Sequence, residues 1–121
     1  MVEVPGKKVM STAVARTVAH LQSVGGLKGT DIANIVGVSA PTVSRWSNEK
    51  ASPPLATQTV LAELRYVVDR LSDFYTPDEA RLWLHAKHPL LGQNRAIDLI
   101  RAGQTEEVLG VIERMDAAAY L

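Results

Sequence analysis

GVSAPTVSRW, residues 37–46, is the stretch from which the fold of this chain can be worked out. Gly37 provides the backbone freedom that a tight turn needs, and Ser39 is placed to cap a helix that runs to about Ser47. Pro41 falls in the first turn of that helix, where a missing N–H costs nothing. The stretch therefore predicts a tight turn and then a short helix carrying one strong cation, Arg45.

Apolar residues at three- and four-residue steps predict helices on both sides of this stretch. We expect a first helix that Ser11 caps and that ends at Gly25-Gly26, and a second that follows Gly29 and runs to Val36. A long helix is expected from about Val60 to Tyr75, and the next runs from a Thr76 capping box to about Lys87. The last two are expected from about Asn94 to Gly103 and from a Thr105 cap to the C-terminus. Residues 88–93 are expected to form a loop. No run alternates with period two for long enough to be a strand, so the predicted fold is all-α.

Residues 29–48 match the pattern of a DNA-binding helix-turn-helix. Ala33 is the small residue at the helix crossing, and Gly37 forms the turn between the helices. The positions that seat the second helix on the first are apolar: Ile32, Val36, Val38, Val43 and Trp46. A plain helical hairpin without a DNA role is the alternative, but the match is complete and its flanking helices are present.

The outward residues of the second helix are small or able to hydrogen-bond, as a helix in the major groove requires. The predicted DNA-binding residues are Ser39, Ala40, Thr42, Ser44, Arg45, Asn48 and Lys50. The run Thr-Val-Ser-Arg-Trp resembles the recognition helices of the Xre/Cro-repressor group. Because only Arg45, Lys50 and Lys28 supply positive charge nearby, a monomer should bind DNA weakly, and we expect a homodimer or larger assembly.

Size and composition limit the remaining possibilities. A chain of 121 residues forms one compact domain, or two very small ones that share a core. The absence of cysteine excludes disulfides, thiolate metal sites and thiol nucleophiles. The apolar runs are far shorter than the roughly 18 residues of a membrane span, and no signal-peptide pattern opens the chain, so we expect a cytoplasmic protein without a membrane partner.

The net charge of zero hides an asymmetry between the two halves. Residues 1–60 carry six basic and three acidic side chains, a net charge of +3. Residues 61–121 carry seven basic and ten acidic side chains, a net charge of −3. Such a difference suggests two surfaces with different partners.

Residues 76–121 extend beyond a minimal repressor and resemble the toxin-binding domain of Xre/MbcA/ParS-type antitoxins. The matching motifs are Trp83-Leu84, His88-Pro-Leu-Leu-Gly92, Ile97-Asp-Leu-Ile100, Gly103 and Val108-Leu-x-x-Ile112. The chain departs from the family pattern at His88, Gln93 and Ala96, where the family has Asn, Gly and Pro. The resemblance covers about residues 27–121, with both halves in family order.

This resemblance implies that the chain is an antitoxin with two activities. It would inhibit a RES-domain toxin that degrades NAD, and it would repress its own operon by binding operator DNA. The resemblance divides the chain into a DNA-binding domain with a long connecting helix, residues 1–75, and a toxin-binding domain, residues 76–121. The implied toxin-binding residues are Trp83, Leu90, Leu91, Gly92, Arg95, Ile97, Tyr120 and Leu121. We also expect this chain to form a higher hetero-oligomer with the toxin. The C-terminal tip would enter the toxin's NAD pocket; alternatively, Tyr120 and Leu121 fold back on the core.

Other motifs do not support a catalytic or metal-binding role. His85 and His88 have a spacing that can hold a metal on a helix, but no third ligand completes the site. Gly25 to Gly29 follows a helix and lacks the Gly-Lys-Ser/Thr ending of a phosphate loop, so it is expected to be a turn. No nucleophile and base are paired, so we expect a non-enzyme without a cofactor. A stand-alone transcriptional regulator, whose C-terminal domain dimerises or senses a ligand, remains the alternative to an antitoxin.

Overall fold

The structure, a computed structural model, describes residues 5–119. These residues form seven α-helices and one very short strand pair, which confirms the predicted all-α fold. The elements in chain order are α1 (Pro5–Ser23), α2 (Gly29–Val36), α3 (Ala40–Ser47), α4 (Leu55–Leu71), α5 (Pro77–His85), β1 (Lys87–His88), the 3₁₀ turn η1 (Pro89–Leu91), β2 (Asn94–Arg95), α6 (Ala96–Arg101) and α7 (Thr105–Ala119). None of the described helices is both long enough and apolar enough to cross a bilayer.

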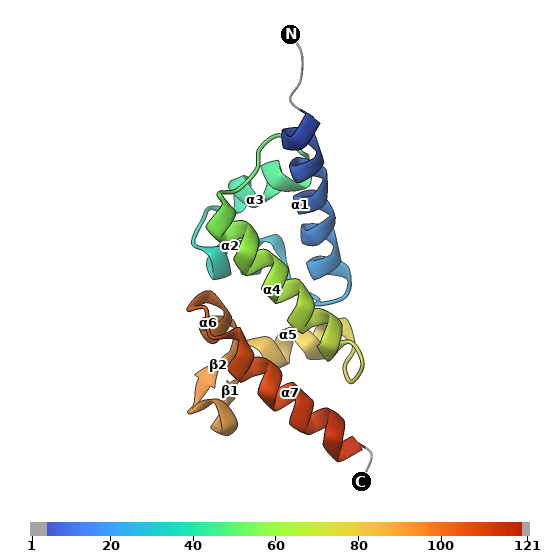
Figure 1. The fold of residues 1–121 in the computed structure, drawn as a ribbon, viewed down its shortest axis with the longest axis vertical. Coiled ribbons are helices and arrows are strands. Elements are labelled where there is room, and N and C mark those ends of the chain that lie inside the picture. The colour runs from blue at the N-terminus through green and yellow to red at the C-terminus, as the bar shows by residue number, and fades with distance from the viewer. Residues whose placement is uncertain (1–4, 120–121) are drawn as a thin grey trace.

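Helix α4 joins the two ends of an elongated molecule (Figure 1). It contacts α1 and α2 on the side of the helix-turn-helix and α6 and α7 on the other side. The residues that it buries are Leu61, Leu64, Val67, Val68 and Leu71. Burying a side chain of this size stabilises the fold by roughly 1.5–3 kcal/mol. Both halves of the chain therefore share one hydrophobic core.

Two of the predicted helix starts are confirmed in detail. The Ser39 hydroxyl accepts a hydrogen bond from the Thr42 N–H at 3.3 Å and so caps α3. Thr76 and Glu79 form a reciprocal capping box at the start of α5, with each side chain accepting from the other's backbone N–H. These bonds satisfy N–H groups that have no partner within the helix.

Two other predicted caps are wrong because each hydroxyl has a partner far away in the sequence. Helix α1 begins at Pro5, and Ser11 lies inside it, buried, with its Oγ 2.7 Å from the Oγ of Ser52. Thr105 is the first residue of α7, and its hydroxyl donates to the Glu63 carboxylate at 2.7 Å. Ser11 thus connects α1 to the segment just before α4, and Thr105 connects α7 to α4 itself.

Helix α5 ends at His85, two residues before the predicted end at Lys87. Lys87 and His88 instead pair with Arg95 and Asn94 in an antiparallel strand pair. The predicted loop between these strands contains the turn η1. The short hairpin formed by residues 87–95 contacts α6 through β2 and α7 through η1.

Candidate functional site

The predicted recognition helix α3 is seated on α1 and α2 by its apolar face. Val43 and Trp46 are each 2% exposed, and both belong to the common core. Gly37 adopts the left-handed conformation predicted for the turn, with φ of 76°. The opposite face of α3 is therefore held outward by the packing of these residues.

The predicted DNA-binding residues lie on α3, at its two caps and, for Lys50, in the turn that follows it. Thr42 is half-buried, and the others are exposed: Ser39, Ala40, Ser44, Arg45, Asn48 and Lys50. An Arg45 guanidinium nitrogen lies 3.3 Å from the Thr42 hydroxyl, which itself contacts the Ser39 hydroxyl at 2.8 Å. The Asn48 amide donates to the carbonyl of Ser44 at 2.9 Å. The surface thus presents hydroxyl, amide and guanidinium groups that can contact base edges and phosphates.

The predicted toxin-binding residues divide into an exposed and a buried set. Leu90 is 64% exposed at the tip of the hairpin, Gly92 is exposed, and Arg95 is half-buried. Trp83, Leu91 and Ile97 are buried in the common core of the chain, and they support the surface from beneath. Tyr120 and Leu121 lie outside the described residues.

Several local contacts hold the hairpin that presents Leu90. The His88 ring packs against Trp83 at a tilt of 39° with 4.4 Å between centroids, and its Nε2 donates to the Trp83 carbonyl at 2.8 Å. Gly92 and Gln93 both have positive φ, and the Asn94 amide donates to the Leu91 carbonyl at 2.9 Å. The hairpin is therefore fixed both to α5 and within itself.

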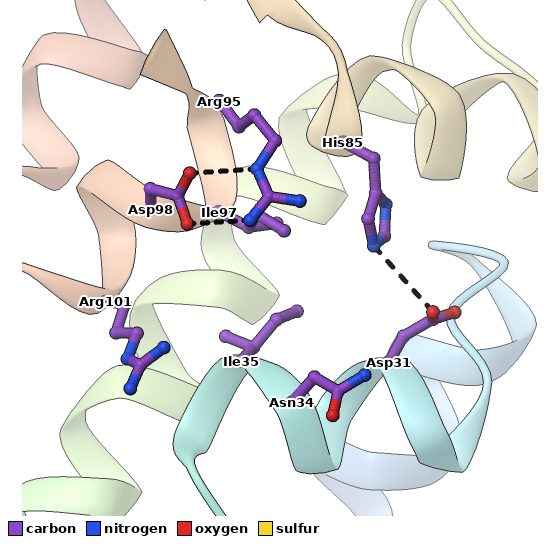
Figure 2. Close-up of a pocket in the computed structure, with 8 residues that line it drawn as sticks. All are labelled: Asp31, Asn34, Ile35, His85, Arg95, Ile97, Asp98 and Arg101. Atoms are coloured by element: carbon purple, nitrogen blue, oxygen red, sulfur yellow. Dashed lines mark hydrogen bonds and ion pairs between the residues drawn. The ribbon is translucent and has the colours of Figure 1, made fainter.

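A polar pocket of about 330 Å³ lies between α2, α5 and the segment from β2 to α6. Figure 2 shows Arg95 and Asp98 on one side of it and His85 and Asp31 on the other. The complete lining is Asp31, Asn34, Ile35, His85, Arg95, Ile97, Asp98 and Arg101. The pocket thus combines two predicted toxin-binding residues with residues from the helix-turn-helix.

Both carboxylates of the pocket are held by arginines. Arg81 donates to the two oxygens of Asp31 at 2.8 and 3.0 Å, and Arg95 donates to those of Asp98 at 2.9 and 3.0 Å. The hydrogen bonds from Arg81 hold the pKa of Asp31 below its ordinary value, despite the opposing effect of burial. Those from Arg95 likewise lower the pKa of Asp98. Both groups are therefore charged at neutral pH.

The pair of Asp31 and Arg81 also links the two halves of the chain. Asp31 lies in the first turn of α2, where its carboxylate accepts from the Lys28 N–H at 2.8 Å. His85 donates from Nδ1 to the Arg81 carbonyl, and its Nε2 lies 3.7 Å from Asp31. The sequence analysis placed none of Asp31, Asn34 and Arg101 in a site. The available signal was Asp31 itself, because an acidic residue among the apolar residues of α2 indicates a buried carboxylate with a basic partner.

His85 and His88 have separate structural roles. Each histidine donates to a backbone carbonyl of α5, His85 to that of Arg81 and His88 to that of Trp83. Within residues 5–119, no three His, Asp or Glu side chains are close enough together to hold a metal ion.

Comparison with known proteins gives relatives over most of the chain. No protein-family model matches. The mycobacterial cidal antitoxin MbcA of Mycobacterium tuberculosis is 28% identical over 116 residues, which is 96% of this chain and 99% of MbcA. A probable mycobacterial cidal antitoxin of the same organism is 34% identical over 96 residues, 79% of this chain and 82% of that protein.

The fold is also similar to a solved structure. A chain in the crystal structure of the M. tuberculosis MbcT-MbcA toxin-antitoxin complex matches with a TM-score of 0.76 and 30% sequence identity. The match covers 88% of this chain and 96% of that chain. Sequence and structure therefore agree on the same relatives.

Proposed function

This chain belongs to the MbcA-type antitoxin family, and from that premise we propose that it neutralises a RES-domain, NAD-degrading toxin and represses its own operon. The observation that carries the proposal is the match to MbcA relatives along nearly the whole chain, helix-turn-helix and C-terminal helices together. An antitoxin acts by binding, so the chain is a toxin–antitoxin component and not an enzyme. The family assignment favours this role over that of a stand-alone regulator.

The toxin contact is proposed at residues 76–121, centred on the exposed hairpin. Leu90 offers an apolar side chain, and Gly92 leaves the backbone beside it accessible. Arg95 connects the hairpin to the polar pocket, where a partner side chain can form hydrogen bonds with Asn34 and Arg101. An apolar anchor with a polar surround is the usual composition of a protein interface. The NAD-degrading class of the toxin is an inference from the family resemblance.

The operator contact is proposed at residues 1–75, through the outward face of α3. Its polar side chains and small Ala40 permit close approach to a major groove. Since the described face carries few cations, binding to DNA would require self-association or assembly with the toxin. Both activities belong to a cytoplasmic protein.

The toxin contact is tested by a matched pair of leucines. Leu90 and Leu82 are 64% and 65% exposed, so Leu90→Glu and Leu82→Glu add the same charge to similarly accessible sites. We expect Leu90→Glu to weaken co-purification with the proposed RES-domain toxin, and Leu82→Glu to retain it. Equal binding by the two variants would contradict the hairpin as the contact. NAD consumption by the purified complex tests the toxin class separately.

The operator contact is tested by replacing Arg45. A lost base contact costs roughly 1–3 kcal/mol, so Arg45→Ala should weaken operator binding by about 5- to 150-fold in gel shifts at fixed salt. Arg114→Ala removes an exposed cation from α7 and serves as the control. Equal affinity of the two variants for the operator, with both folded by circular dichroism, would refute DNA reading by α3.

A further inference from the structure

Arg101, the last residue of α6, reaches across to the helix-turn-helix. One of its guanidinium nitrogens lies 3.8 Å from the position that a Cβ on Gly37 would occupy, beside the turn between α2 and α3. Figure 2 shows the Arg101 side chain extending from α6 away from the paired Arg95 and Asp98. A cation from the C-terminal half of the chain thus lies beside the turn that leads into the predicted recognition helix.

The guanidinium of Arg101 is available to an anion from outside the chain. Arg101 is exposed, and none of the described side chains, those of residues 10–118, forms an ion pair or hydrogen bond with it. Arg81 and Arg95, by contrast, each hold an aspartate through two hydrogen bonds. Asp98, one turn before Arg101 in α6, has both of its oxygens occupied by Arg95. The charge of Arg101 therefore has no direct counter-charge among these side chains.

The helix-turn-helix has no cation of its own at this position. Residues 29–44 contain neither lysine nor arginine. Arg45 lies in the last turn of α3 and Lys50 follows that helix, so both cations of the recognition surface lie near its C-terminal end. Recognition helices contact base edges with their N-terminal residues, and the phosphates that border the groove there are bound by cations. Arg101 supplies a cation at that end of α3 from another part of the chain.

The position of Arg101 suits a phosphate at the border of a major groove. Gly37 precedes the cap residue Ser39 by two residues, which span at most about 7 Å. The guanidinium therefore lies within roughly 12 Å of the Ser39 backbone, which is about the width of the major groove. A base contact by Ser39 or Thr42 thus brings a bordering phosphate within reach of Arg101.

An amide group on α2 can complete the same contact. Asn34 lies one helical turn before Gly37, and both Asn34 and Arg101 line the polar pocket. Asn34 is exposed, and its amide forms no hydrogen bond with any side chain that the structure describes. Amide and guanidinium side chains are both common donors to phosphate oxygens. The two halves of the chain therefore offer one charged and one neutral donor at this place.

We propose that Arg101, assisted by Asn34, binds a backbone phosphate of the operator at the border of the groove that α3 enters. The proposal extends the operator contact beyond residues 1–75, and it rests on the DNA binding proposed for α3. Because the same two residues line the pocket that is offered to the toxin, the test follows both partners.

The first measurement is DNA binding by the purified full-length chain over a range of salt concentrations. Each neutralised phosphate contributes about 0.9 to the magnitude of the slope of log K against log salt. Arg101→Gln removes the charge but keeps a hydrogen-bonding side chain, so it should lower this slope by about 0.9. The affinity advantage of the wild-type chain over Arg101→Gln should therefore shrink roughly 3.5-fold between about 50 and 200 mM salt. Arg101→Lys should keep the wild-type slope, and Arg114→Gln, which removes an exposed cation from α7, is the control for net charge.

A phosphate contact should also be independent of base sequence. Arg101→Gln should weaken binding to the operator and to an unrelated duplex of the same length by the same factor. Arg45→Ala should weaken the operator complex more than the unrelated one. Asn34→Ala should cause a smaller loss on both duplexes with an unchanged salt slope, because the amide carries no charge.

Four results would overturn the proposal, and they separate it from the proposed function. If Arg101→Gln lowers the slope no more than Arg114→Gln does, the phosphate contact is wrong while the contact of α3 stands. If Arg101→Lys lowers the slope as much as Arg101→Gln, the side chain acts through packing. Loss of toxin co-purification by Arg101→Gln with a wild-type salt slope would assign Arg101 to the toxin alone. A wild-type chain that binds no DNA would refute the operator contact itself and this proposal with it. Equal urea midpoints of the variants confirm that they are compared in the folded state.

Discussion

Replacing Gly26 by alanine tests how the helix-turn-helix is joined to the C-terminal half. Gly26 lies in the turn between α1 and α2 with φ of 64°, a conformation that costs an L-residue roughly 1–2 kcal/mol. A methyl group there would lie 2.3 Å from the carbonyl oxygen of Pro77, the first residue of α5. That distance is about 1 Å inside van der Waals contact. The turn and α5 would have to separate.

The expected loss of stability follows from these two effects. Overpacking of this kind costs about 1–3 kcal/mol, so Gly26→Ala should lower the free energy of unfolding by about 2–5 kcal/mol in total. With a urea dependence of about 2 kcal/mol per molar, the midpoint should fall by roughly 1–2.5 M. Urea titrations followed by circular dichroism measure this shift.

Two other glycines provide matched controls for the same substitution. Gly103 has φ of 80°, but a methyl group added there would have no atom within 4 Å, so Gly103→Ala should cost only the conformational part, roughly 1–2 kcal/mol. Gly110 lies within α7 with open space beside it, so Gly110→Ala should stabilise the helix by roughly 0.5–1 kcal/mol. If Gly26→Ala loses no more stability than Gly103→Ala, the described contact between the turn and α5 is wrong.

Three further predictions concern the separate surfaces and the ion pair between the halves. Arg45→Ala should still rescue cells from the toxin, and a failure to neutralise at normal expression would contradict the division into two surfaces. Deleting residues 117–121 should leave a chain that co-purifies with the toxin but no longer prevents NAD loss; full inhibition by the truncated chain would make the tip structural. Because Arg81 lowers the pKa of Asp31, the stabilisation from this carboxylate is complete above the ordinary value of 3.8 and disappears as the pH falls through the lowered pKa. Acid unfolding of the wild-type chain should thus be steeper below about pH 4 than that of Asp31→Asn, and parallel curves would show that the pair contributes little.

The sequence by itself was sufficient for the features that depend on neighbouring residues. The Ser39 cap, the Thr76 capping box and the left-handed turn at Gly37 are all present where the local pattern predicts them. Each depends on bonds or backbone angles within about four residues, so the necessary information lies in one short stretch. The helical periodicity of the apolar residues likewise predicts the all-α fold, because it records which face of each helix is buried.

Only the tertiary structure decided which side chains remain at the surface. Trp83, Leu91 and Ile97 belong to a motif that the family resemblance connects with toxin binding, yet the fold buries them and leaves Leu90 exposed. Ser11 and Thr105 look like caps, but each has a partner about 40 residues away. The pocket brings together three segments of the chain, which no local pattern joins. Such contacts depend on how the helices pack across a shared core, and a periodic sequence pattern states that a face is buried without stating against what.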